Sequence, residues 1–262
     1  MTTAVAERAG RPPGESLFSV RGLTRRYGET LVLDDLSFEV LRGECLVILG
    51  RSGSGKSVTL RQLNGLESPD GGEVFFDGQP VSTLTERELL PVRRRVSMLF
   101  QSGALFDSMD VFENIAFPLR EHTDLDEDGI RAKVAEKLAL VHLPGIEDKT
   151  PGELSGGMKK RVALARSLAL DPEAVLFDEP TTGLDPITSA TIASLIDRVR
   201  GLGMTCVVVT HDLALARRVA DRVALLDQGR FRFLGTWAEA ERCSDPVFQD
   251  FLTGREEIEN AA

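Results

Sequence analysis

Eight consecutive residues from Gly50 to Ser57 (GRSGSGKS) have the composition of a loop that binds phosphate groups. They match the pattern G-x-x-x-x-G-K-[ST], with an apolar run before them and a helical pattern after them. Glycines at these positions let several backbone N–H groups turn inward at a helix start, where the helix dipole also favours an anion. Lys56 would reach the β- and γ-phosphates of a nucleotide, and the Ser57 hydroxyl would bind Mg²⁺. A chance glycine-rich turn is the alternative to this interpretation.

Two adjacent carboxylates, Asp178 and Glu179, end the apolar run 174–177. A buried carboxylate is costly unless it has a partner. Mg²⁺ provides one for Asp178, through a bound water. Glu179 would then lie beyond the γ-phosphate, where it would orient and polarise an attacking water. A strand end that turns into solvent is the alternative for this segment alone, but with the glycine-rich loop it predicts a nucleotide-binding protein.

A second helix start with exposed amides occurs at 154–158 (LSGGM). Ser155 is a good N-cap residue, and Gly156 and Gly157 follow it before a long helical run. One chain has no use for two such helix starts on the same γ-phosphate. We therefore expect a head-to-tail dimer in which this segment of each chain closes on the ATP of the other. An ordinary capped helix is the alternative.

Strand-like and helix-like segments alternate around these sites. Apolar runs with strand character lie at 17–20, 31–40, 44–49, 74–78, 174–177, 204–209 and 222–226, and helical patterns at 57–66, 130–140, 158–170, 188–200 and 212–219. Strands that alternate with helices predict a parallel sheet covered by helices. Between about 102 and 170 strand signals are few, so we expect a helical insertion that forms its own lobe.

The composition excludes several classes of protein. The 262 residues have a net charge of −10, which argues against a general nucleic-acid binder. No apolar stretch approaches the ~18 residues of a membrane helix, and the first residues have no hydrophobic signal core, so we expect a cytoplasmic location. Residues 1–16 are typical of a disordered leader. Cys45, Cys206 and Cys243 form no CxxC pair and are interpreted as small apolar residues.

From about residue 17 to 240 the chain resembles the nucleotide-binding subunits of ABC transporters. The matching elements are Tyr27 where an aromatic residue stacks on adenine, the Walker A loop 50–57, Gln101 of the Q-loop, the signature 154–158, Walker B with Glu179, the D-loop 183–186 and the switch histidine His211. The resemblance implies an α/β fold, with a P-loop (RecA-like), mostly parallel sheet, an N-terminal antiparallel β subdomain and an inserted α-helical subdomain at about 102–170. A C-terminal helix and tail would occupy 241–262.

The resemblance also implies the roles of individual residues, with ATP and Mg²⁺ as cofactors. Glu179, His211, Gln101 and Lys56 would be catalytic, and Ser57, Gln101 and Asp178 would bind Mg²⁺. The nucleotide would be bound by Tyr27, Gly50, Arg51, Ser52, Gly53, Ser54, Gly55, Lys56, Ser57, Val58, Gln101, Ser155, Gly156, Gly157 and Asp185. Gln101 would report the γ-phosphate to the helical lobe, which receives a membrane permease. Met158 stands where the family usually has Gln, but Ser155, Gly156 and Gly157 are in place, so we expect hydrolysis.

Several stretches resemble one subgroup, the Mla-type, Mce-associated phospholipid-transport ATPases of double-membraned bacteria. They include 98–106, 111–114, 118–123 and 205–209. The resemblance implies phospholipid cargo, a permease in the inner membrane, an Mce-domain lipid-binding protein and, often, a STAS-domain subunit. An ABC motor for another small molecule is one alternative. A soluble ABC ATPase that acts on DNA or ribosomes is another, although such proteins usually have tandem ATPase units or long coiled-coil insertions.

Overall fold

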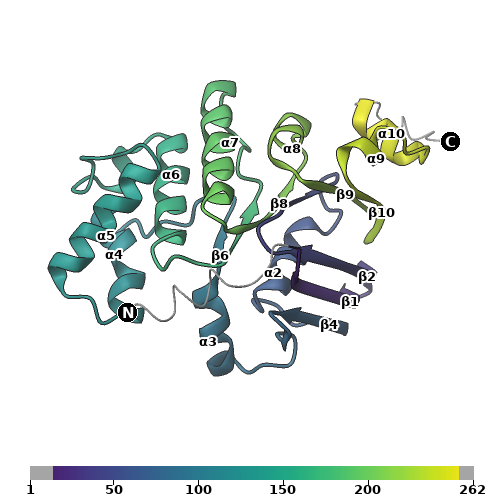
Figure 1. The fold of residues 1–262 in the computed structure, drawn as a ribbon, viewed down its shortest axis with the longest axis horizontal. Helices are drawn as coiled ribbons and strands as arrows, with labels where there is room; N and C mark the ends of the chain where they lie inside the picture. The colour runs from purple at the N-terminus through teal and green to yellow at the C-terminus, as the bar shows by residue number, and fades with distance from the viewer. Residues whose placement is uncertain (1–13, 254–262) are drawn as a thin grey trace.

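A computed structural model describes residues 14–253, in which two sheets meet (Figure 1). The larger sheet has the strand order β10-β9-β3-β8-β7-β6. Its strands are β3 (Cys45–Leu49), β6 (Val96–Leu99), β7 (Ala174–Asp178), β8 (Thr205–Thr210), β9 (Arg222–Asp227) and β10 (Arg230–Gly235). All neighbouring pairs are parallel except β9 and β10. The predicted mostly parallel sheet is therefore confirmed.

The smaller sheet is antiparallel and has the order β2-β1-β4-β5. Its strands are β1 (Ser16–Tyr27), β2 (Thr30–Leu41), β4 (Gly71–Phe76) and β5 (Gln79–Pro80). The short strand expected at 17–20 is thus the beginning of a strand of 12 residues that continues to Tyr27. This sheet is the N-terminal antiparallel part of the expected fold.

The larger sheet separates two hydrophobic cores. Successive residues of a strand point to opposite faces, and on β3 Val47 packs into the core on the helical side while Ile48 packs into the core shared with the antiparallel sheet. All five residues of β3 are fully buried. The continuous apolar run that leads into the glycine-rich loop is therefore a strand covered on both faces, as its composition predicts.

Nine α-helices and one short 3₁₀ helix complete residues 14–253. They are α2 (Lys56–Leu63), α3 (Glu86–Arg95), α4 (Val111–His122), α5 (Glu127–Leu140), the 3₁₀ helix (Pro151–Glu153), α6 (Gly156–Ser167), α7 (Pro186–Gly201), α8 (Leu213–Val219), α9 (Trp237–Ala240) and α10 (Pro246–Thr253). Helices α4, α5 and α6 pack on one another at one end of the molecule (Figure 1). None of the helices in this part of the chain is long and apolar enough to cross a membrane.

Sequence patterns did not indicate α3, α4, β5, β6, β10 or α9. Helix α3 buries only Leu89 and Val92 and contains Pro91, so it has no regular apolar stripe. Strand β6 has four residues, two of them only partly buried. Such short or weakly patterned segments adopt their structure because of the neighbours on which they pack.

Part of each predicted terminal segment lies outside the described residues. Residues 1–13 of the expected leader 1–16 are outside it, and β1 begins at Ser16. Of the expected C-terminal helix and tail, α10 is described and residues 254–262 are outside the range. Helix α10 is anchored on β10 by Phe248, which is fully buried and stacks on Phe233 with 4.7 Å between the ring centroids.

Candidate nucleotide-binding site

A cavity of about 720 Å³ lies where the glycine-rich loop meets the antiparallel sheet and the ends of β7 and β8. It is lined by Tyr27, Val32, Arg51, Ser52, Gly53, Gly55, Lys56, Ser57, Val58, Gln101, Glu179, Thr182, His211 and Phe251. The fold thus brings together the predicted aromatic residue, most of the loop, Gln101, Glu179 and His211. Of the predicted loop residues, Gly50 and Ser54 do not line the cavity.

The loop between β3 and α2 is shaped by contact with β2. Gly55 has φ +103°, and a Cβ atom there would lie 2.7 Å from Leu33 Cδ2 and 3.0 Å from the backbone oxygen of Val32. A side chain would therefore be strained by both its backbone conformation and its surroundings. Glycine at this position therefore allows β2 to pack closely against the loop, which lines the cavity.

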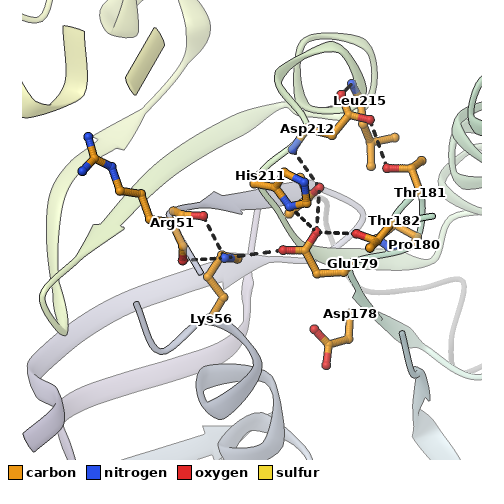
Figure 2. A network of polar contacts seen from close by, with 12 residues as sticks. Arg51, Lys56, Asp178, Glu179, Pro180, Thr181, Thr182, His211, Asp212 and Leu215 are labelled. Atoms are coloured by element: carbon orange, nitrogen blue, oxygen red, sulfur yellow. Dashed lines mark hydrogen bonds and ion pairs between the residues drawn. The ribbon is translucent and has the colours of Figure 1, made fainter. Parts of the chain in front are cut away.

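Lys56 is buried, with 6% of its surface exposed. Its Nζ donates hydrogen bonds to the carbonyl oxygens of Gly50 (2.7 Å) and Arg51 (2.9 Å) and lies 3.4 Å from Glu179 Oε1. The ammonium group therefore ties the start of the loop to its end and balances the charge of Glu179 across the cavity (Figure 2).

Ser57 and Asp178 are adjacent, as the magnesium hypothesis requires. The Ser57 hydroxyl donates to Asp178 Oδ1 at 2.7 Å. Burial raises the pKa of Asp178, while the Ser57 hydrogen bond and the charges of Arg61 and Lys56 act in the opposite direction. Gln101 lines the same cavity as Ser57, whereas Asp178 reaches it only through its bond to Ser57. A hydroxyl, a carboxylate and an amide oxygen are hard oxygen donors of the kind that Mg²⁺ prefers. The donor set therefore fits this ion.

Four side chains converge on the carboxylate of Glu179: those of Lys56, His211 and Thr182 (Figure 2) and that of Thr210, whose hydroxyl donates a hydrogen bond at 3.4 Å. Lys56 approaches one oxygen, while the other lies 2.9 Å from His211 Nδ1 and accepts a hydrogen bond from the Thr182 hydroxyl at 3.1 Å. A carboxylate can only accept, so the proton between it and the imidazole resides on Nδ1. His211 is 61% exposed at its side chain and borders the cavity.

Glu179 has an unusual backbone conformation. Its φ is +46°, in the left-handed region that non-glycine residues seldom adopt. Such a conformation costs on the order of 1–3 kcal/mol and persists only where the surroundings impose it. The Glu179 N–H donates to the Val209 carbonyl at 2.9 Å, which ties the residue to the end of β8. The strain directs the carboxylate out of the sheet and into the cavity.

Tyr27 lies at the end of β1 and is 42% exposed. Its hydroxyl donates to Glu67, and the Arg25 guanidinium lies 4.8 Å from its ring centroid. Burial, followed by the bond to Glu67, raises the pKa of the Tyr27 hydroxyl. The ring is therefore held in position at the border of the cavity.

Besides Gly50 and Ser54, four further predicted ligands, Ser155, Gly156, Gly157 and Asp185, do not line the cavity of their own chain. The Ser155 hydroxyl accepts a 3.3 Å hydrogen bond from the Met158 N–H and caps α6. Asp185 caps α7 and accepts backbone hydrogen bonds. The two helix starts touch, because a Cβ atom on Gly157 would lie 2.3 Å from Thr188 Cγ2. Ser155, Gly156 and Asp185 are exposed, whereas Gly157 is buried.

Sequence reasoning missed three residues that line the cavity: Val32, Thr182 and Phe251. Thr182 has a local signal, a hydroxyl three residues after the predicted catalytic carboxylate. Phe251 has none, since only the packing of α10 on β10 brings this aromatic side chain to the site.

Comparison with known proteins identifies related chains. A family model described as ABC transporter matches residues 33–182. The intermembrane phospholipid transport system ATP-binding protein MlaF of Haemophilus influenzae is 43% identical over 241 residues, which are 92% of this chain and 91% of the relative. The MlaF protein of Escherichia coli is 42% identical over 240 residues, 91% of this chain and 89% of the relative. The probable ribonucleotide transport ATP-binding protein mkl of Mycobacterium tuberculosis is 43% identical over 251 residues, 95% of this chain and 70% of the relative.

Solved structures show the same fold. An ATP-binding cassette determined as a dimer in a post-hydrolysis state with ADP and Pi has a TM-score of 0.78 and 32% identity, and the match covers 84% of this chain and 98% of the cassette. The protein cbiO1 of Clostridium perfringens, part of the ABC transporter complex cbiONQ, has a TM-score of 0.80 and 30% identity, with 91% of this chain and 95% of that protein covered.

Proposed function

Because the chain belongs to the ABC transporter ATPase family, we propose that two copies bind ATP head to tail and that hydrolysis drives transport through a membrane partner. One observation carries the proposal. The cavity gathers the loop, Gln101, Glu179 and His211, while the capped start of α6 at Ser155 lies on a different exposed surface. A second chain is needed to bring such a surface to the nucleotide.

In this proposal, the residues that line the cavity have separate roles in ATP binding and hydrolysis. Backbone N–H groups of the loop and the ammonium of Lys56 bind the phosphates and balance charge on the transferring group. Tyr27 stacks on the adenine. Glu179 accepts a hydrogen bond from the attacking water and orients it, and His211, already paired with Glu179, contacts the γ-phosphate.

Ser57, Asp178 and Gln101 would hold Mg²⁺ next to the β- and γ-phosphates. When bound, the ion neutralises charge that develops on the phosphate oxygens. The Ser57–Asp178 hydrogen bond places the two oxygen donors together in advance.

The dimer supplies the remaining groups. Ser155, Gly156 and Gly157 of one chain close on the γ-phosphate of the other, and Asp185 lies at the same interface. The contact of Gly157 with Thr188 joins the two segments into one surface. The dimeric cassettes at 32% identity support this arrangement.

Phospholipid is the proposed cargo, delivered through an inner-membrane permease with an Mce-domain protein and, where present, a STAS-domain subunit. The MlaF relatives align over about nine-tenths of their length, and the stretches around 98–123 resemble the same subgroup. A ribonucleotide is the second candidate, since relatives named for ribonucleotide transport are equally similar. We assign the ATPase unit to 17–240, with its helical subdomain at about 102–170.

A groove of about 480 Å³ between α3, α4 and the end of α6 is the proposed permease surface. It is bordered by Phe106 and Phe117, which are 44% and 41% exposed and lie edge to face at 5.5 Å. Arg94 and Arg166 also line it. Such a groove fits a permease helix with apolar and acidic side chains.

The test is purification of the tagged full chain from its native membranes in mild detergent. Co-purifying proteins are identified and bound lipids extracted. A permease, an Mce-domain protein and phospholipid would support the proposal. A permease with a solute-binding protein and no Mce-domain protein would overturn the cargo and leave the motor intact. Phe117→Asp should release the permease, whereas Leu202→Asp, at a 58% exposed leucine outside the groove, should retain it.

A further inference from the structure

Lys160 is a buried cation on α6, five residues beyond Ser155, and is 6% exposed. Its Nζ donates to three backbone carbonyl oxygens of the segment that follows β7: Glu179 at 3.3 Å, Pro180 at 3.0 Å and Thr182 at 2.7 Å. An ammonium group has three N–H donors, and these three carbonyl oxygens can satisfy all of them. Lys160 therefore joins the helix of the signature segment to the segment that begins with the proposed water-orienting carboxylate.

The three carbonyl oxygens face one point in the interior. Carbonyl dipoles aimed at a common point repel one another, and a cation at that point removes the repulsion. The backbone curls in this way because Glu179 has φ +46°. The conformation that directs the Glu179 side chain into the cavity also directs its carbonyl toward Lys160.

Stability alone does not account for a charged residue at this position. A buried cation loses its hydration, and apolar residues of similar volume often stabilise a core equally well or better. Burial accordingly lowers the pKa of the Lys160 ammonium, while the charge of Glu179 acts in the opposite direction. Because burial of the Lys160 ammonium is unfavourable, its presence here is better explained by the backbone segment that it holds in place.

We propose that Lys160 is a positioning residue for ATP hydrolysis, which holds segment 179–182 in the curled conformation that aims Glu179 at the attacking water. Lys160 does not line the cavity, and it acts through the backbone carbonyls of segment 179–182 that it binds. The inference rests on the role proposed for Glu179. It adds that the signature helix sets the geometry of its own chain's catalytic carboxylate.

The test measures single-turnover ATP hydrolysis and ATP affinity in the assembly purified through a tag on this chain. Lys160→Met should lower the hydrolysis rate about 10- to 100-fold, because small displacements of a catalytic group have effects of this size. ATP affinity should stay within about twofold, since the phosphate-binding loop is untouched. Lys159→Met, at the neighbouring and partly exposed cation of the same helix, is the matched control and should leave both quantities unchanged.

A double-mutant cycle separates positioning from general damage. If Lys160 acts through Glu179, adding Lys160→Met to Glu179→Gln should lower the residual hydrolysis no further. Additive losses, or an unchanged rate in Lys160→Met, would overturn the inference. An unchanged rate in Glu179→Gln would instead overturn the role proposed for Glu179.

Two other variants guard against a folding defect. Lys160→Gln keeps two N–H donors without the charge and should retain more activity than Lys160→Met. Lys160→Arg keeps both charge and donors and should retain most of it. If all three variants lost activity equally while their thermal midpoints stayed unchanged, the donor-based mechanism would be wrong.

Discussion

At the residue scale, the site is centred on the carboxylate of Glu179, which several side chains contact at once. Glu179 is approached by an ammonium, an imidazole and a hydroxyl, from Lys56, His211 and Thr182. Each of these groups comes from a different segment. The contacts of the carboxylate therefore depend on the relative positions of the loop, the end of β8 and the segment after β7. ATP binding would compete for Lys56 and His211 and free the carboxylate for water.

Glu179→Gln should lower ATP turnover about 10²- to 10⁴-fold, the range typical of removing a general base. The amide keeps the size of the side chain but cannot accept a proton, so an ATP-bound closed dimer should accumulate. Phosphate release measures the first effect and size-exclusion chromatography with Mg-ATP the second. Glu73→Gln, at an exposed carboxylate of β4, is the control. Undiminished turnover in Glu179→Gln would contradict the assignment.

At the element scale, a buried amide organises the segment between Gln101 and α4. Asn114 is fully buried, and its side chain exchanges hydrogen bonds with the Phe106 N–H (2.9 Å) and the carbonyls of Phe106, Met109 and Asp110. The stretch 111–114 supports the family resemblance, and the structure gives Asn114 a structural reason for its position: it fixes the loop that carries one side of the groove.

Asn114→Ala should lower the free energy of unfolding by about 2–4 kcal/mol, because several buried backbone groups lose their partners. Urea denaturation measures the loss. Glu121→Ala, at an exposed position near the end of the same helix, should stay within about 0.5 kcal/mol of the parent. A loss as small as that of the control would show that water replaces the amide.

Helix α10 should affect nucleotide affinity through Phe251, which borders the cavity. Phe251→Ala should weaken ATP binding about two- to tenfold, the equivalent of one aromatic contact of ~0.5–1.5 kcal/mol. The turnover rate at saturating ATP should change little, because no catalytic group moves. Titration with a fluorescent ATP analogue tests this, with Thr253→Ala, at an exposed end of the same helix, as the control. Equal affinities would place Phe251 outside the bound nucleotide's reach.

At the scale of the whole molecule, the two surfaces that the proposed function requires lie on different parts of one chain. The cavity is lined by the glycine-rich loop and by residues of both sheets, and Ser155 and Asp185, at the exposed starts of α6 and α7, do not line it. In the proposed function, these two surfaces meet at one phosphate only when they belong to two different chains.

Mixed dimers test this sharing. Lys56→Ala should inactivate both sites of a dimer, and Ser155→Arg should block both closures. A dimer with one chain of each kind has one site in which Lys56 and the partner's Ser155 segment are both intact, so mixing two inactive proteins should restore up to about one-quarter of parental turnover, if half the dimers are mixed and their sites act independently. Co-expression with two different tags isolates the mixed dimers. No recovery would argue for a site complete within one chain or for strict coupling of the two sites.

The sequence by itself determined the local chemistry of this protein. Three features each consist of a few adjacent residues: the loop 50–57, the carboxylates at the end of β7 and the capped start of α6. Their local sequence patterns are therefore enough to predict their conformations. The continuous apolar run of β3 likewise predicts, from its composition alone, that the strand is buried on both faces. These features predicted the fold class, the site of the nucleotide and the need for a dimer.

Only the tertiary structure decided which distant residues meet. Lys160 and Phe251 have no pattern in their neighbourhood that reveals their partners, because those partners are backbone groups and cavity walls from other parts of the chain. The left-handed conformation of Glu179 also depends on the ends of β7 and β8. Convergence of this kind is a property of packing, and it appears only when the elements occupy their places in the fold.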